Sequence, residues 1–101
     1  MAKITGKDAE RLLGNVPEEN VFWCCDGRVF RNMRELAEAF DSMTYETFAH
    51  HSNQDRCDFG NWVRDVIGDG KLARDLAKSQ APTQAGRRVV ERVEFLSARL
   101  A

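Results

Sequence analysis

The chain has 101 residues, of which 43% are hydrophobic and 31% charged, and its formal net charge is −1. This length and composition predict one ordinary globular domain, residues 1–101, and exclude a disordered chain. The near-zero charge provides no overall attraction to nucleic acid or to a membrane surface.

The cysteines and the first residues favour a cytoplasmic location. Three cysteines, an odd number that includes the adjacent pair Cys24 and Cys25, suit a reducing compartment better than a disulfide framework. The first ten residues contain no apolar signal segment. The longest apolar run, residues 21–25, is too short to span a bilayer, so we expect no membrane partner.

The first predicted element is a short helix over about residues 6–13, followed by a linker to residue 19. Thr5 and Asp8 stand at the spacing of a capping box, in which each residue satisfies a backbone N–H of the other. Gly14 supplies the stop after the helix.

A β-hairpin is predicted over residues 20–31, because apolar residues flank the turn sequence Asp26-Gly27 on both sides. A two-residue turn at that point would pair Trp23 with Phe30 and place both on one face. Both faces of such a hairpin are apolar. We therefore expect one face to pack on helices and the other face, or a free edge, to meet a partner chain.

The remaining residues, 32–101, are predicted to be helical. The expected N-caps are Asn32, Thr44, Asp58, Asp69 and Thr83. The clearest amphipathic pattern has apolar residues at i, i+3, i+4, i+7 and i+8; they are Phe59, Trp62, Val63, Val66 and Ile67. Gly68 closes that helix. The fold class is therefore α+β and mainly α, with an N-terminal β-hairpin packed on five to six short helices in one compact domain.

The segment AHHSNQDRCD, residues 49–58, concentrates residues that can bind metals, but its spacing argues against a metal site. On a helix, His50 and His51 point about 100° apart. In a strand, Cys24 and Cys25 face opposite sides. The sequence contains no C-x-x-C or H-x-x-x-H spacing. We therefore expect no metal and no cofactor.

The same segment carries the residue types of an activated thiol. Cys57 precedes a predicted helix, whose N-terminus lowers a thiol pKa, and His51 and Asp58 lie nearby in the sequence. Such catalytic groups are recognised by geometry and not by spacing. The alternative is that Cys57 is an incidental or buried cysteine, and the enzyme hypothesis therefore ranks behind a non-catalytic one.

The C-terminal helix supplies two other candidate contacts. From residue 69 onward the chain carries seven basic and four acidic residues, and Arg88 and Arg92 lie along one side of the last helix. These arginines could contact phosphates, although a charged run of this kind is more often a solvated face. Phe95 lies more than 100° from the centre of the helix's apolar stripe. It therefore indicates a second contact surface, for a protein partner or a homodimer.

The segments DGRVFRNMRELAEAF, HHSN, DFGNWVRDVIGD and LARDLA resemble a family of small archaeal and bacterial domains of unknown function. Its pattern is roughly H-x-N, then N-D-F-x-x-W-(I/V)-x-x-x-x-G-D, and the resemblance covers about residues 20–78. The matching positions are Asp26, Gly27, Asn32, His51, Asn53, Asp58, Phe59, Trp62, Val63, Gly68 and Asp69. Cys57 departs from the pattern, which has asparagine there, and Ser52 stands where an apolar residue is expected.

The leading hypothesis for function is a cytoplasmic, non-catalytic protein-interaction or regulatory module. The second is a domain that binds a small molecule or nucleic acid, and the third is a thiol enzyme built on Cys57, His51 and Asp58. The candidate binding or interaction residues are His50, His51, Asn53, Asp58, Phe95, Arg88 and Arg92.

Overall fold

The structure, a computed structural model, describes residues 4–100; residues 1–3 and 101, the two ends of the predicted domain, lie outside the described part. Its elements in chain order are α1 (Gly6–Leu13), η1 (Glu18–Asn20), β1 (Phe22–Trp23), β2 (Val29–Phe30), α2 (Met33–Ser42), α3 (Tyr45–His51), α4 (Asp58–Trp62), η2 (Val63–Ile67), α5 (Gly70–Ala77) and α6 (Pro82–Ser97). The predicted class, a mainly helical α+β domain with an N-terminal hairpin, is confirmed. None of the described helices is both long and apolar enough to cross a membrane.

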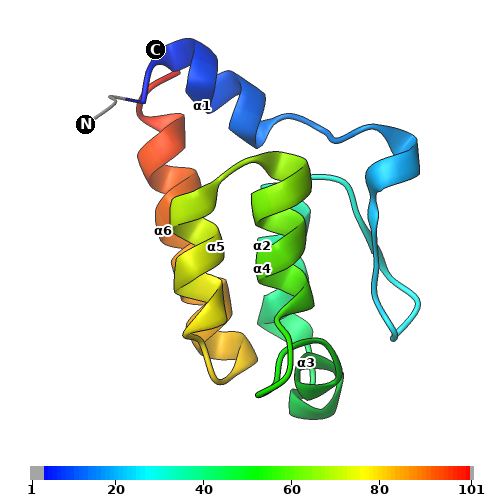
Figure 1. The fold of residues 1–101 in the computed structure, drawn as a ribbon. Helices are drawn as coiled ribbons and strands as arrows, with labels where there is room; N and C mark the ends of the chain where they lie inside the picture. Colours follow the sequence, from blue (N-terminus) through cyan, green and yellow to red (C-terminus); the bar gives the residue numbers. More distant parts are fainter. Residues whose placement is uncertain (1–3, 101) are drawn as a thin grey trace.

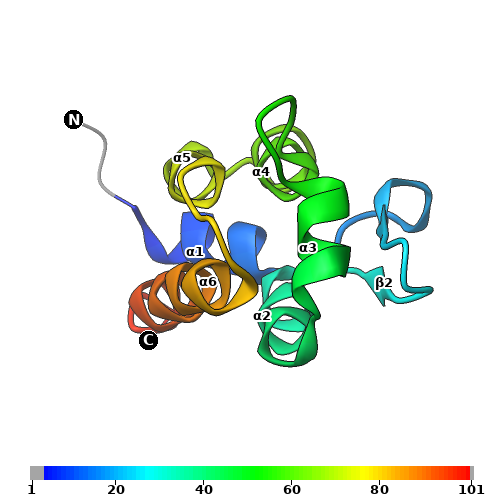
Figure 2. The ribbon, with the colours of Figure 1, turned by 90° about the horizontal axis from the view of Figure 1, so that it is seen from below.

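The helices form two layers (Figures 1 and 2). One layer contains α2 and α6, and the other contains α4 and α5. α1 lies at one end of these layers, α3 lies at the other end, and the hairpin flanks the side opposite α6. Each helix therefore buries one apolar stripe against the opposing layer, as a two-layer domain requires.

Two glycines let the helices approach closely. A Cβ atom on Gly86 of α6 would lie 3.1 Å from the Cβ atom of Phe40 on α2. A Cβ atom on Gly60 of α4 would lie 3.1 Å from the carbonyl oxygen of Ala73 on α5. Glycine at these positions leaves room for the neighbouring helix, because it has no side chain.

An aromatic cluster ties the hairpin to the helices. The ring centroid of Phe59 lies 4.9 Å from that of Phe40, 5.2 Å from that of Phe22 and 5.8 Å from that of Phe48. Phe22 also stacks on Phe30 across the hairpin. All five side chains are buried. The predicted apolar helix that contains Phe59 is thus the centre of the core.

Four of the predicted helix starts are confirmed. Thr5 and Asp8 form the capping box of α1, with both reciprocal hydrogen bonds at 3.1 Å. The side chains of Asn32, Thr44 and Asp69 accept backbone N–H groups at the starts of α2, α3 and α5. A short polar side chain at these positions therefore marks the helix boundary, as expected.

The other two predicted caps are wrong. Cys57, and not Asp58, is the N-cap of α4, because its Sγ atom accepts the N–H of Gly60 at 3.3 Å. Asp58 is the first residue of the helix, and its carboxylate turns toward α3. Thr83 does not begin α6 either, because Ala81 is the N-cap and Pro82 is the first residue of the helix. Proline suits that position because its φ angle is already helical and it lacks an N–H.

The predicted hairpin register is also wrong by one residue. Phe22 pairs with Phe30 and Trp23 with Val29, so Trp23 and Phe30 lie on opposite faces. The connection has three residues, 25–27, with Gly27 at a φ of 95° and its N–H bonded to the carbonyl oxygen of Cys24. A turn that ends in a left-handed glycine favours this longer loop. Phe22 and Phe30 consequently face the core, and Trp23 faces outward with 74% of its surface exposed.

α4 continues directly into the π-helical segment η2 and ends at Gly68, as predicted. Gly68 has a φ of 94°, and its N–H donates to the carbonyl oxygen of Val63 at 2.7 Å. A residue in the left-handed conformation can donate its N–H to a carbonyl oxygen at the end of the helix, and it turns the chain away from the helix axis. The chain then starts α5 at once, with Asp69 as its cap.

Candidate functional site

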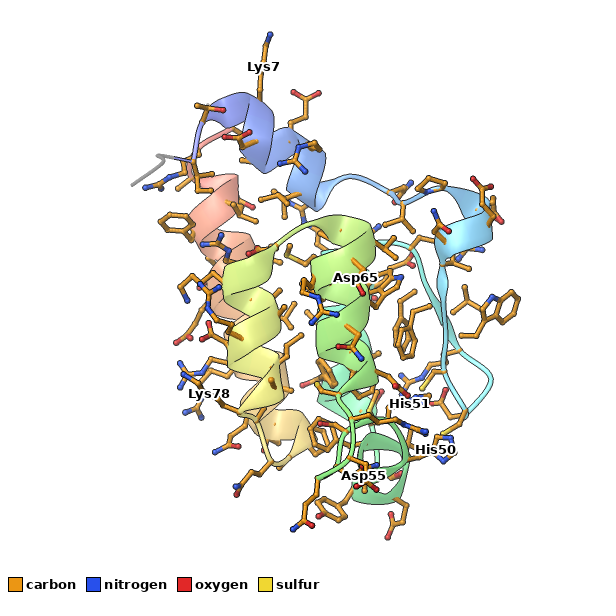
Figure 3. All side chains as sticks on the ribbon, in the orientation of Figure 1. Lys7, His50, His51, Asp55, Asp65 and Lys78 are labelled. Atoms are coloured by element: carbon orange, nitrogen blue, oxygen red, sulfur yellow. The ribbon has the colours of Figure 1, made fainter. Side chains whose placement is uncertain are left out.

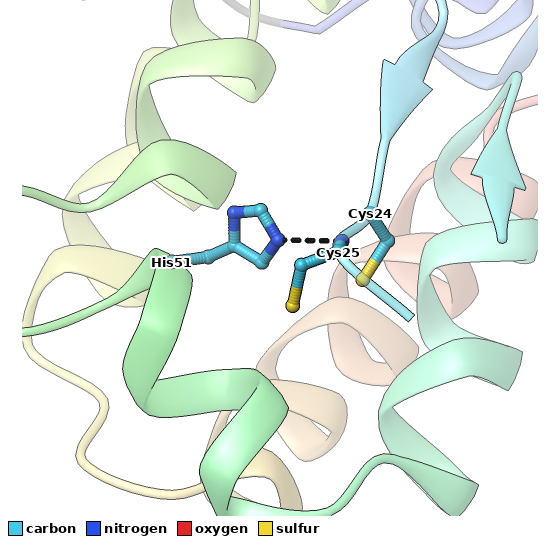
Figure 4. A group of neighbouring side chains, drawn as sticks. All are labelled: Cys24, Cys25 and His51. Atoms are coloured by element: carbon cyan, nitrogen blue, oxygen red, sulfur yellow. Dashed lines mark hydrogen bonds between the residues drawn. The ribbon is translucent and has the colours of Figure 1, made fainter. Parts of the chain in front are cut away.

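His51 is the centre of the polar joint between α3, α4 and the hairpin (Figure 3). Its Nδ1 atom lies 2.9 Å from Oδ2 of Asp58, and its Nε2 atom accepts the backbone N–H of Cys25 at 3.0 Å (Figure 4). An acceptor at Nε2 and a carboxylate at Nδ1 together indicate the neutral tautomer with its proton on Nδ1. The histidine is only 6% exposed, and both ring nitrogens have their hydrogen-bond partners within the protein.

The local sequence explains why His51 and Asp58 meet. Thr44 begins α3, and the helix ends at His51 before a tight loop that an isolated bridge between Ser52 and Cys57 closes. The return of the chain sets the first turn of α4 beside the last turn of α3. Asp58 also lies 3.3 Å from Nε of Arg56, so its carboxylate bridges an imidazole and a guanidinium.

Asn53 stabilises this loop and does not face His51. Its Nδ2 atom donates to the carbonyl oxygen of Ala49 at 3.0 Å, and its Oδ1 atom accepts the N–H of Asp55 at 2.9 Å. Asn53 is exposed. His50 is exposed as well, with its ring centroid 4.9 Å from that of His51. Among the candidates in this segment, His51 and Asp58 are therefore the pair joined by a hydrogen bond.

The adjacent cysteines lie opposite His51. One donor atom from each of Cys24, Cys25 and His51 lies within 4.8 Å of the other two. Neighbouring cysteines would face opposite sides in a strand, but β1 ends at Trp23, before both of them. Burial raises the pKa of the Cys24 thiol to about 11. This thiol is therefore protonated at neutral pH, which makes it a poor nucleophile.

The predicted thiol triad is not assembled around Cys57. Its Sγ atom accepts the N–H of Gly60 and lies 3.7 Å from the hydroxyl of Ser52. The hydrogen bonds of His51 go to Asp58 and to the Cys25 backbone instead. The histidine and the carboxylate thus meet as the hypothesis requires, but the thiols beside them belong to the hairpin turn.

The candidates on α6 lie on the opposite side of the molecule from the hairpin (Figures 1 and 2). The guanidinium of Arg92 forms two hydrogen bonds with the carboxylate of Asp69, at 2.7 and 3.1 Å. The two side chains are only 10% and 1% exposed. Arg92 therefore has a structural role and is not available to a phosphate.

The other two α6 candidates form a charged groove with α5. Arg88 pairs with Glu91 at 3.1 Å, and on α5 Lys71 pairs with Asp75 at 2.7 Å. Phe95, 39% exposed, lines the groove, with the guanidinium carbon of Arg99 3.8 Å from its ring centroid. The cationic groups of this groove are therefore largely neutralised by adjacent carboxylates.

Comparisons with known proteins give no relative from which a role could be transferred. No family model matches the chain, and no curated protein or solved structure matches it significantly.

Sequence reasoning misses three residues of this region. A strand geometry separates the side chains of Cys24 and Cys25, but β1 ends at Trp23, and the turn-forming Asp26-Gly27 is the sequence signal for this. A two-residue turn places Trp23 on the face of Phe30, whereas a three-residue turn places it outside.

Proposed function

We propose that the protein is a non-catalytic interaction or regulatory module of the cytoplasm. We further propose that it binds a second copy of itself through the hairpin face that carries Trp23. The observation that supports this proposal is the 74% exposure of Trp23. Tryptophan is enriched among the residues that dominate binding energy at protein interfaces. The other tryptophan, Trp62, is 7% exposed and belongs to the core.

We take a second copy as the partner because the hairpin and the turn before it carry both signs of charge. Asp26 pairs with Arg28 at 2.9 Å, and Glu18 approaches Arg31 at 3.6 Å. A two-fold interface places the same patch on both sides, so a patch with both signs can complement itself. The net charge of −1 adds little repulsion between copies.

Phe95 is a weaker candidate anchor than Trp23. Guanidinium groups of Arg92 and Arg99 already lie 5.1 and 3.8 Å from its ring centroid. These cations cover part of the aromatic face. Nucleic-acid or small-molecule binding at the α6 groove has less support, since Arg88, Arg92 and Lys71 pair with carboxylates there. A thiol enzyme has less support because His51 does not bond Cys57.

Sedimentation equilibrium over a concentration series tests the proposal. The wild-type chain is expected to show a reversible monomer–dimer equilibrium. Trp23→Ala should raise the dimer dissociation constant by about 30-fold or more, the effect of losing a hot spot worth about 2 kcal/mol. Tyr45→Ala is the matched control, because Tyr45 is 61% exposed but lies on α3. A wild type that stays monomeric, or equal effects of the two substitutions, would overturn the proposal.

A further inference from the structure

We infer that Cys24, Cys25 and His51 form a zinc site that fastens the tip of the hairpin to the end of α3. This inference rests on residues other than those of the proposed interaction face, and it holds or fails independently of self-association. The donor atoms come from two segments that are 26 residues apart in the chain. Figure 4 shows both sulfur atoms and the imidazole gathered at the hairpin turn.

The distances fit a small tetrahedral ion after a modest contraction. The two Sγ atoms and one ring nitrogen lie within 4.8 Å of one another. Zinc bonds of about 2.3 Å to sulfur and about 2.0 Å to nitrogen hold such donors roughly 3.5–4 Å apart. The turn that carries Cys25 is exposed, so the sulfur atom of Cys25 can move closer to the other two donor atoms by the required distance of about 1 Å.

The surroundings of His51 match those of a metal-ligating histidine. Metal ligands of this type donate the second ring N–H to a carboxylate, which orients the ring and raises its basicity. Asp58 occupies that position, 2.9 Å from Nδ1. The lone pair of Nε2 is then directed at the turn with the two thiols, where the N–H of Cys25 now occupies it at 3.0 Å. Zinc would take the place of that N–H.

The donor set favours zinc for reasons of charge and softness. Thiolates and imidazole are the ligands that zinc prefers. One zinc ion with two thiolates and a neutral imidazole has no net charge, which suits a site where Cys24 and His51 are 6% exposed.

Three protein ligands leave the fourth position of a tetrahedral zinc ion for a water molecule. Solvent can reach this position because Cys25 is exposed. The role that we assign to the ion is to crosslink the hairpin to α3, because its donor atoms come from both segments. Because thiols lose protons when they bind the metal, uptake of zinc releases protons.

Cobalt provides the first measurement, on the full chain kept reduced with a phosphine. The wild type should show a thiolate-to-cobalt charge-transfer band and the intense visible bands of a tetrahedral ion. Both should saturate at one equivalent and disappear when zinc is added. Replacing both cysteines, in Cys24→Ser/Cys25→Ser, should abolish the charge-transfer band. Cys57→Ser, the matched control outside the group, should leave it unchanged. The inference is overturned if the reduced wild type shows no such band, or if the band survives in the double variant.

Zinc affinity, measured by competition with a chromophoric chelator, tests the roles of His51 and Asp58. Asp58→Asn should weaken zinc binding by about 10- to 100-fold, as loss of a carboxylate behind a ligand does. His50→Ala is the control for the neighbouring imidazole and should not change the affinity. Far-ultraviolet circular dichroism confirms that each variant is folded. Equal affinities of Asp58→Asn and the wild type would show that this carboxylate does not support a metal ligand and would overturn the assignment.

Discussion

Asp69 connects two helices through one buried carboxylate. Its Oδ1 atom accepts the N–H of Leu72 at the start of α5, and both oxygens accept hydrogen bonds from Arg92 on α6. The side chain is 1% exposed. A carboxylate so far from water is tolerated because each oxygen is bonded and the charge is compensated.

Arg92→Ala is expected to lower the free energy of unfolding by about 3–5 kcal/mol, because it leaves the Asp69 charge buried without a partner. Arg88→Ala, four residues earlier on the same helix, removes an exposed pair with Glu91 and should cost less than about 1 kcal/mol. Urea denaturation of both variants gives the comparison. Similar costs for the two substitutions would show that the buried pair contributes no more than a surface pair.

At the residue scale, hydrogen bonds between residues close in the sequence could be predicted, whereas those between distant residues could not. The cap of Asp69 on α5 follows from a three-residue spacing and could be predicted. Its pair with Arg92, 23 residues away, depends on how α5 and α6 pack. The same holds for His51: a local reading found no role for it, whereas the fold brings it to Asp58 and to the backbone of Cys25.

At the scale of the element, the end of the α4–η2 helix depends on Gly68. Its φ of 94° lies in the left-handed region, where a side chain is strained. A Cβ atom there would also lie 3.3 Å from Nη1 of Arg11. Gly70, two residues later, begins α5 with ordinary backbone geometry, and an added Cβ would meet only Arg74 Nη1 at 3.7 Å.

A comparison of Gly68→Ala with Gly70→Ala distinguishes the cost of backbone strain from the general effect of replacing a glycine. Gly68→Ala should cost about 1–2 kcal/mol of unfolding free energy, the price of a left-handed residue with a side chain. Gly70→Ala should be neutral or stabilise by up to about 1 kcal/mol, since it restricts the unfolded chain. Thermal unfolding of the two proteins is the measurement. A tolerated Gly68→Ala would mean that the helix can end in another conformation.

The elements were predictable where periodicity and caps agreed, and less so where a turn sets the geometry. The apolar stripe around Phe59 and the stop at Gly68 follow directly from the sequence. The hairpin was predicted correctly, but one additional turn residue shifts the register and places Trp23 and Phe30 on opposite faces. Phe30 therefore lies in the core, whereas Trp23 is exposed.

At the scale of the whole molecule, the aromatic cluster around Phe59 joins elements that local hydrogen bonds do not connect. The rings packed against it come from β1, α2 and α3. An isolated two-stranded hairpin has little stability of its own, so its packing on this cluster must hold it in place. The hairpin and the helices are therefore expected to unfold together as one cooperative unit.

Phe59→Ala tests this coupling, because it removes the ring at the centre of the cluster. It should lower the unfolding free energy by about 3–5 kcal/mol, the usual cost of truncating a buried phenylalanine to alanine. Tyr45→Ala, which removes an exposed ring, should change it by less than about 0.5 kcal/mol. In both proteins the transition followed by tryptophan fluorescence should coincide with that followed by circular dichroism, because Trp62 contacts the hairpin through Phe22. If the fluorescence transition of Phe59→Ala precedes the helical one, the hairpin separates before the helices unfold, and the domain is not a single cooperative unit.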